Sequence, residues 1–279
     1  MSTPWHIQRM AALDFEASDK DSETARIVSC ALILVGGNLP TDTRTWLVNP
    51  GIPQEPGAIA VHKLTDEHLA EHGAPAEQAV PEIAKSVAEV VAGGVPLVGH
   101  NLGGYDLNLL DRECRRHLGD SLEGIVRQPL TRVIDTMVLD RQVAPYRKRV
   151  SEEQGPYQMR TTAETYGLPW NEEQAHGAEY DALMSARAAY KMGAIAHTPY
   201  RDRPDWVRAL RTNRFNSLRG VTVEELHERQ IEWYRRDAEG YQAWLRDAAK
   251  SKEKHDPEAV IPTAWPLRPV PAPRNGGDR

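Results

Sequence analysis

The chain has 279 residues, of which 40% are hydrophobic and 27% charged, and its formal net charge is -6. This charge argues against a broad non-specific nucleic-acid binder, because such proteins usually present a basic surface. No segment approaches the ~20 apolar residues that span a bilayer, and no signal peptide is recognisable at the N-terminus. Cys30 and Cys114 are too few for a disulfide framework and are expected to be buried free thiols, so a cytoplasmic protein is predicted.

Three strands are predicted in the first fifty residues. They are the stretch that begins at Ala11 and the apolar runs 26–35 and 45–48, which turn signals separate. Side chains alternate along a strand, so Asp14 and Glu16 point to the same side. Two like charges on one face cost stability unless something positive lies between them. The pair is either a solvated strand end or a pair of ligands for a metal ion.

Helical and strand-like segments alternate further along the chain. Apolar residues recur at the helical period over 80–92, a short buried strand follows at 95–98, and a second helical pattern covers 107–118. Residues 133–139 begin as a strand and continue as a helix, and 179–196 form another helix. This order predicts a mixed sheet flanked by helices, in an α/β or α+β fold.

Two further acidic positions stand at helix starts. Asp106 follows a glycine-rich loop, at a place where a carboxylate often only complements the helix dipole. His176 and Asp181 are five residues apart, which is a rotation of about 140° on a helix, so they cannot share one face. Gly177 therefore predicts that His176 lies in the loop before the helix that carries Asp181. Taken alone, such a histidine is more often structural or solvated than catalytic.

The set taken together favours metal chemistry. Asp14, Glu16, Asp106 and Asp181 are four carboxylates, and hard divalent cations such as Mg²⁺ and Mn²⁺ prefer oxygen ligands of this kind. Paired ions about 4 Å apart can stabilise the attacking and leaving oxygens of a phosphodiester displacement. A neutral histidine beside them, here His176, can take the proton from the attacking water.

The motifs resemble a known family. Asp14-Phe15-Glu16, then His100-Asn101 with Tyr105-Asp106, then His176 with Asp181, follow the order of the DEDDh (DnaQ-like) 3'-5' exonucleases, which include the epsilon proofreading subunit of bacterial DNA polymerase III and ribonuclease T. The resemblance covers roughly residues 8–196. It implies a ribonuclease-H-like fold with a mixed five-stranded sheet flanked by helices.

The resemblance also implies a role for each acidic residue. Asp14 would bridge two divalent cations, Mg²⁺ or Mn²⁺, and Glu16 and Asp181 would hold the cation that carries the nucleophilic water. Asp106 would support the site, partly through water, and His176 would be the general base.

Substrate contacts are implied at four further positions. Phe15 and the backbone around Ala17 would lie near the terminal nucleotide, and His62 and Asn101 would contribute further contacts. The chain departs from the family at Ala17, where Thr is usual, and at Lys63, where Gly is usual. The loop between Asn101 and Asp106 is one residue longer than usual and contains Gly103-Gly104, which could absorb a bulge at little steric cost.

The C-terminal part has a different composition. The exonuclease domain is expected over 1–197, a basic and aromatic helical extension over 198–250, and a Pro-rich disordered tail over 251–279. Thr222 and Glu225 form a capping box that opens a long helix. Its aromatic residues either pack on the domain or stack on single-stranded bases.

Basic segments at 141–160 and 201–219 are candidates for phosphate contacts, and each is alternatively a solvated face. The function implied by the resemblance is metal-dependent removal of nucleoside 5'-monophosphates from a single-stranded 3' end, of DNA first and of RNA as the alternative. The alternative hypotheses are a docking module of a replication or repair complex and an RNA-processing exoribonuclease. Proofreading would need a DNA polymerase or other replication protein as partner, and no membrane association is expected.

Overall fold

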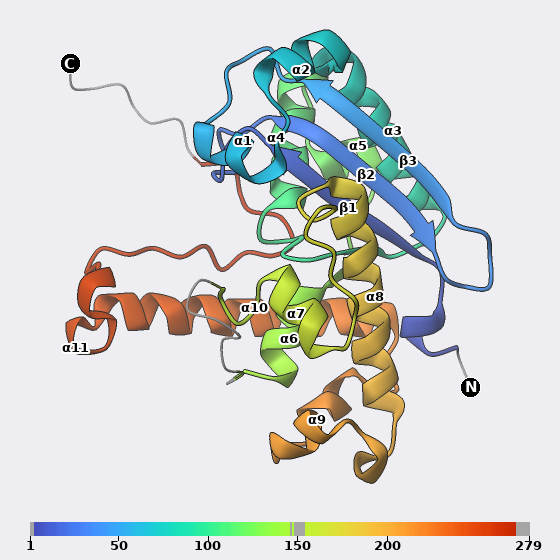
Figure 1. Ribbon diagram of the computed structural model, residues 1–279, viewed down its shortest axis with the longest axis vertical. Coiled ribbons are helices and arrows are strands. Elements are labelled where there is room, and N and C mark those ends of the chain that lie inside the picture. The colour runs from blue at the N-terminus through green and yellow to red at the C-terminus, as the bar shows by residue number, and fades with distance from the viewer. Residues whose placement is uncertain (1–2, 146, 148–153, 272–279) are drawn as a thin grey trace.

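The computed structural model describes residues 3–145, 147 and 154–271 (Figure 1). Its sheet has six strands in the order β4-β3-β2-β1-β5-β6. The strands are β1 (Met10–Ala17), β2 (Ile27–Val35), β3 (Asp42–Asn49), β4 (Ala74–Pro75), β5 (Leu97–Gly99) and β6 (Val133–Asp135).

The predicted meander and mixed sheet are both present. Strands β1, β2 and β3 are antiparallel neighbours, whereas β5 runs parallel to β1 and β6 runs parallel to β5. The predicted strand count is one too low, because β4 pairs with the end of β3 through only two residues. A strand of two residues has no side-chain alternation that a sequence pattern could reveal.

Helices cover both faces of the sheet (Figure 1). They are α1 (Pro56–His62), α2 (Asp66–His72), α3 (Ala76–Ala92), α4 (Asp106–Leu118), α5 (Leu122–Val126), α6 (Thr136–Val143), α7 (Met159–Thr165), α8 (Ala178–His197), α9 (Asp205–Ala209), α10 (Val223–Arg246) and α11 (Ala248–Ser251). None of these described helices is long and apolar enough to cross a membrane. Helix α1 was not predicted, although Pro56 in its first turn is a helix-start signal.

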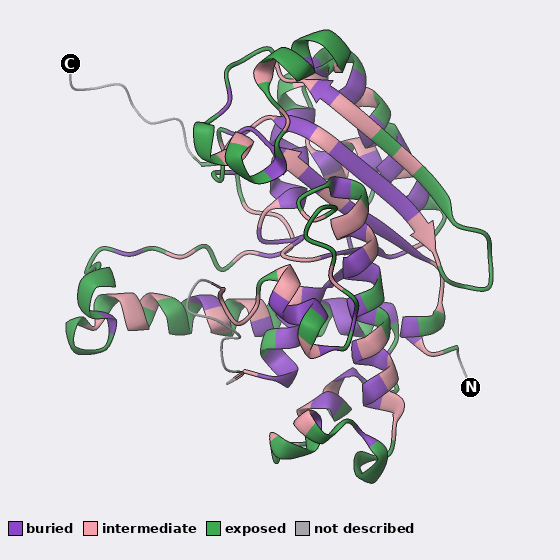
Figure 2. Cartoon of the chain, in the orientation of Figure 1, coloured by how far each residue is buried: buried purple, intermediate pink, exposed green. Residues whose placement is uncertain are grey.

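Alternation along β1 divides the core into two clusters. Met10 and Ala12 face α8, whereas Ala11, Leu13 and Phe15 face the side that α3 and α4 cover. Figure 2 shows the buried residues concentrated in the strands and the helices packed on them. Because Asp14 and Glu16 continue the Met10–Ala12 alternation, the fold directs both carboxylates toward α8.

Helix α10 covers the edge strand β6. His227 Nδ1 accepts a hydrogen bond from the Val133 N–H at 3.3 Å, and Gln230 Oε1 accepts one from the Asp135 N–H at 2.7 Å. Gln230 Nε2 in turn donates to the Val133 carbonyl oxygen at 2.9 Å. An open sheet edge would leave these backbone groups unpaired, so the helix replaces the strand that is missing at this edge.

The prediction that residues 251–279 form a disordered tail is wrong as far as Pro271. Trp265 is 5% exposed and joins the core cluster that contains Leu102 and Leu107. The composition is poor in apolar residues, but one tryptophan buries enough surface to dock an extended segment. Residues 272–279 lie outside the described residues.

Some arginines of the basic segments 141–160 and 201–219 are buried or paired within the protein. Arg203 is 2% exposed and donates to Asn216 Oδ1 at 2.6 Å, so it stabilises the extension and is not available to a phosphate. Arg147 pairs with the buried Asp140 at 2.5 Å. In the same segment, Arg160 pairs with Glu164 and Glu172, and Arg141 is exposed. Lys148 and Arg149 lie outside the described residues.

Candidate active site

Three of the predicted carboxylates meet between β1 and α8. Asp14 and Glu16 project from one face of β1, and Asp181 lies in the first turn of α8, which packs on that face. One carboxylate oxygen from each of the three residues lies within 4.8 Å of the other two. The strand supplies two ligands by its period of two, and the helix supplies the third by starting directly above them.

The three carboxylates disfavour their own ionisation. Burial raises the pKa of Asp14 well above its usual range, and the charges of Asp106, Glu16 and Asp181 add to this effect. Burial, followed by the charges of Asp181 and Asp106, raises the pKa of Glu16 to about 8. Burial raises the pKa of Asp181 to about 6, although the positive charge and the backbone N–H of His176 oppose the shift.

A cation would relieve this repulsion. Among the described residues, no Lys, Arg or His forms an ion pair with Asp14, Glu16, Asp106 or Asp181. Asp181 Oδ1 is buried and has no hydrogen-bond partner in the described part of the chain. Carboxylate oxygens that are close together, unpaired and partly buried suit a hard divalent cation, so the donor set fits Mg²⁺ or Mn²⁺.

Asp106 lies beside this group without belonging to it. It is 5% exposed, and its Oδ1 accepts a hydrogen bond from the Phe15 N–H at 3.3 Å. Burial raises the pKa of Asp106 well above its usual range. The structure therefore places Asp106 against the backbone between the two β1 carboxylates, while the three-residue group within 4.8 Å excludes it.

Asp135, which the sequence analysis missed, holds the loop before Asp106. Its carboxylate accepts hydrogen bonds from the backbone N–H groups of Asn101 at 2.9 Å, Gly103 at 3.1 Å and Met137 at 3.0 Å. It caps α6 and ties this helix start to the neighbouring loop. An aspartate between a strand and a helix is an N-cap signal that could have identified it.

His176 lies on the loop before α8, as predicted. It is exposed, and its backbone has a φ of 62°, in the left-handed region that few side chains adopt without cost. The charge and the backbone N–H of His176 both act to lower the pKa of Asp181, so the histidine lies next to the three carboxylates. Residues held in this conformation cluster at functional sites, where the rest of the structure fixes them.

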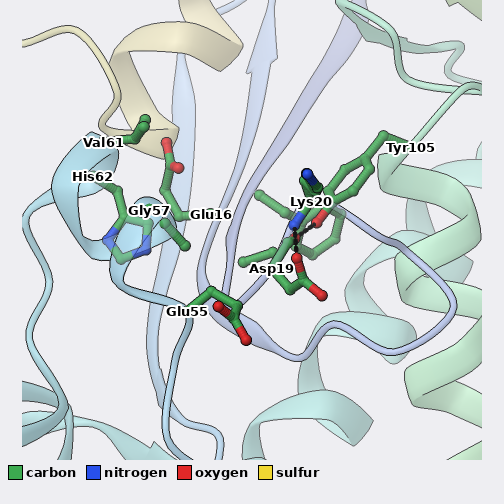
Figure 3. Close-up of a pocket in the computed structure, with 11 residues that line it drawn as sticks. Glu16, Asp19, Lys20, Glu55, Gly57, Val61, His62 and Tyr105 are labelled. Carbon is green, nitrogen blue, oxygen red and sulfur yellow. Dashed lines mark hydrogen bonds between the residues drawn. The ribbon is translucent and has the colours of Figure 1, made fainter.

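A pocket of about 570 Å³ opens beside Glu16 (Figure 3). In Figure 3, Lys20 and Tyr105 lie across the pocket from Val61 and His62. Ligand sites of small organic molecules have volumes in this range. The lining residues are Phe15, Glu16, Ala17, Asp19, Lys20, Glu55, Gly57, Ala58, Val61, His62 and Tyr105.

The pocket contains three of the predicted substrate contacts. Phe15, Ala17 and His62 line it, whereas Asn101 is not among its lining residues. Asn101 has a φ of 66° and lies along a separate small cavity with Arg141 and Tyr241. Burial lowers the pKa of His62, and the charge of His176 adds to this lowering, so the two histidines lie near each other.

The sequence model of the RNase_T exonuclease family matches residues 11–189, which is more than half of the chain and contains every residue of the acidic group. The chain belongs to the RNase_T exonuclease family. The match confirms the family that the motifs resembled and, with it, the enzyme class of exonuclease. A search of curated protein sequences found no significant match.

Solved structures of exonuclease I share the fold of this RNase_T family member. The E. coli enzyme in complex with a dT13 oligonucleotide has a TM-score of 0.53 and 14% sequence identity, and the comparison covers 66% of this chain. Exonuclease I from Methylocaldum szegediense has a TM-score of 0.50 and 16% identity over 72% of this chain. A complex of ExoI with SSB-Ct has a TM-score of 0.53 and 12% identity over 67%.

This family member spans less than half the length of those enzymes. The comparisons cover 40% of the E. coli chain in the dT13 complex, 41% of the chain in the SSB-Ct complex and 42% of the Methylocaldum szegediense chain. The likeness supports the predicted ribonuclease-H-like α/β fold.

Proposed function

We propose that the protein is a metal-dependent 3'-5' exonuclease that releases nucleoside 5'-monophosphates from a single-stranded 3' end. The observation that carries the proposal is the meeting of Asp14, Glu16 and Asp181 within 4.8 Å, beside a pocket of about 570 Å³. This arrangement offers ligands for cations and a space for a nucleotide at the same end of β1, and Glu16 belongs to both.

The acidic residues would hold two divalent cations, Mg²⁺ or Mn²⁺. Asp14 would bridge them, Glu16 and Asp181 would bind one of them, and Asp106 would support the site from the α4 side. When bound, such a pair supplies positive charge to the attacking and leaving oxygens of the phosphodiester. The raised pKa of Glu16, about 8, means that cation binding must displace a proton at neutral pH.

His176 is proposed as the general base. It is exposed on the loop above the acidic group, so its imidazole has access to water and to substrate. A base in this position takes the proton of the attacking water, which frees the water oxygen to attack the terminal phosphodiester.

The pocket would take the terminal nucleotide. Phe15 offers an aromatic ring, Ala17 a small side chain, and His62 a buried imidazole that lies near the Ala17 backbone. Lys20 is the only Lys or Arg among the residues that line the pocket, and it is proposed as a phosphate contact. The dT13 complex of the E. coli relative supports single-stranded DNA as the first substrate to test.

Two alternatives of the sequence analysis are tested by the same assay. A docking module would keep the fold without cleavage, and an exoribonuclease would prefer RNA. A DNA polymerase or other replication protein remains a predicted partner for a proofreading role.

The test is digestion of 5'-labelled single-stranded DNA and RNA of the same sequence, with Mg²⁺, with Mn²⁺ and with chelator. The expected result is a ladder that shortens from the 3' end, that requires the cation, and that Asp14→Asn slows by at least about 10³-fold, because a catalytic cation contributes several kcal/mol. Asp42→Asn, at an exposed carboxylate on β3, is the matched control and should cleave like the wild type. No ladder on either substrate from folded protein that binds cation would contradict the proposal.

A further inference from the structure

The chain returns to the loop before Asp106 after it has left the family domain. From α11 an extended segment runs back along α10 toward α4 (Figure 1). Gln242 Oε1 accepts a hydrogen bond from the Ile261 N–H at 2.9 Å, which fixes the start of the return. We call residues 261–271 the strap; they lie outside the region 11–189 that the RNase_T family model matches.

The strap contacts the glycine-rich loop that leads into Asp106. A Cβ atom on Gly103 would lie only 2.0 Å from Trp265 Nε1, so the indole packs directly against the loop backbone. Arg268 donates a side-chain hydrogen bond to the Gly104 carbonyl oxygen. These are the two glycines of the lengthened loop, and Asp106 follows them after a single residue.

The strap is also bound to α4, the helix that Asp106 opens. Asn108 Oδ1 accepts a hydrogen bond from the Arg268 N–H at 2.7 Å, while Asn108 Nδ2 donates to the Gly103 carbonyl oxygen at 2.8 Å. Asn108 is fully buried and so links strap and loop through one side chain. Arg112, 6% exposed, donates to the carbonyl oxygens of Arg268 and Pro269, both at 3.2 Å.

The helix start that follows the loop lacks a side-chain cap. Tyr105, the N-cap residue of α4, makes no side-chain capping bond, although a polar N-cap usually fixes a helix start. The loop N–H groups of Asn101 and Gly103 donate to Asp135, whose own N–H is bonded to Gln230 of α10 at 2.7 Å. The C-terminal region therefore supports the loop at two points, through Gln230 and through the strap.

We infer that Trp265 and Arg268 are positioning residues for the active site: they fix the Gly103-Gly104 loop and thereby hold Asp106 beside the acidic group. This inference rests on the proposed metal site. It follows that the affinity of the site for divalent cations depends on residues far outside the family domain. Partners that orient metal ligands typically change affinity or activity 10- to 100-fold when they are removed.

The test compares Arg268→Ala with Arg235→Ala, which removes an arginine that bonds only to Glu232 and Glu239 of its own helix among the described residues. The affinity for Mn²⁺ is measured without nucleic acid, from the concentration that gives half of the Mn²⁺-dependent rise in Tm. Backbone hydrogen exchange over 101–107 and kcat and KM on a single-stranded oligonucleotide are measured in parallel. Each arginine variant is also made in an Asp106→Asn background.

The expected result for Arg268→Ala is about 10-fold weaker Mn²⁺ affinity, faster exchange over 101–107 and a lower kcat at little-changed KM. Arg235→Ala should match the wild type. In the Asp106→Asn background, Arg268→Ala should cause no further loss of affinity, since the residue it positions has lost its charge. This non-additivity separates positioning from general destabilisation, which would lower affinity equally in both backgrounds.

A second pair of variants tests the contact between Gly103 and Trp265. Gly103→Ala should weaken Mn²⁺ binding because its Cβ collides with Trp265, and Trp265→Ala should relieve that collision, so the double variant loses less than the sum of the two. Wild-type Mn²⁺ affinity in Arg268→Ala, or additive losses in both cycles, would overturn the inference while leaving the proposed function intact. A wild-type protein that binds no Mn²⁺ would overturn both.

Discussion

The RNase_T family region and the C-terminal region carry their roles in different ways. In residues 11–189 the functional side chains appear as motifs, because only carboxylates and a histidine can do the proposed chemistry. In the C-terminal region Gln230 and Arg268 belong to no motif. Gln230 acts through Asp135, which is 95 residues away in the sequence, and Arg268 acts through Gly104, which is 164 residues away. Chemistry restricts residue type and so leaves a local signature, whereas support of a loop can be given by many residue types from anywhere in the chain.

The largest effect expected in the family region is at the general base. His176→Asn removes the proton acceptor but keeps a residue type that tolerates the left-handed backbone found there. We expect kcat to fall by about 10²- to 10⁴-fold while Mn²⁺ affinity stays at the wild-type value. Single-turnover cleavage together with a Mn²⁺ titration of Tm measures both. Unchanged kcat, with chemistry as the rate-limiting step, would remove His176 as the base.

The largest effect expected in the C-terminal region is on stability. Phe215 is fully buried in the core cluster that also contains residues of α8. Phe215→Ala should lower the free energy of unfolding by about 3–5 kcal/mol. Because the core is shared, a single thermal transition should move to lower temperature. Tyr241→Ala, at a residue that is 49% exposed on α10, is the matched control and should change Tm little. Two separate transitions would show that the C-terminal region folds independently of the family region.

A smaller effect is expected from the pH dependence of the metal-free site. The pKa of Glu16 is about 8 in the folded chain against an ordinary value of 4.5, so between these values the folded state binds more protons than the unfolded state. The free energy of unfolding therefore falls as pH rises through this window. Glu16→Gln should remove part of this loss at pH 8. A gain of about 1 kcal/mol in the free energy of unfolding would raise Tm by roughly 2–4 °C.

Thermal melts in chelator at pH 5 and pH 8 measure this difference, with Glu228→Gln on the exposed side of α10 as the control. Mn²⁺ should reverse the loss in the wild type, because the cation neutralises the ionised carboxylates. A Glu16→Gln variant that is less stable than the wild type at pH 8 in chelator would show that the carboxylates do not repel one another.

The smallest effect is expected at the pocket. Lys20→Gln should raise KM about two- to fivefold, because an exposed charge contact contributes at most about 1 kcal/mol. If Lys20 contacts a phosphate, the slope of log KM against log salt should also fall by about 0.7. Lys85→Gln, at an exposed lysine on α3, is the control. An unchanged salt slope in Lys20→Gln would place the phosphate elsewhere.

The sequence predicted the meander, the mixed sheet and the positions of Asp14, Glu16 and Asp181, because period-two alternation and helix-start signals are local. It predicted five strands and a disordered tail, and both were corrected by long-range contacts. Strand β4 exists only as a partner of β3, and Trp265 is buried against the Gly103 loop and His227 of α10. The lining of the pocket by Tyr105 and Lys20 was also beyond local patterns, since it depends on how separate loops meet.

The most direct test of the proposed metal site is a crystal structure with a short single-stranded DNA oligonucleotide and Mn²⁺, measured at an anomalous wavelength. We expect Mn²⁺ peaks against the carboxylates of Asp14, Glu16 and Asp181, with two ions about 4 Å apart and the 3'-terminal nucleotide in the pocket beside Glu16. An ordered site without Mn²⁺ at millimolar concentration, or an oligonucleotide bound away from this cluster, would contradict it.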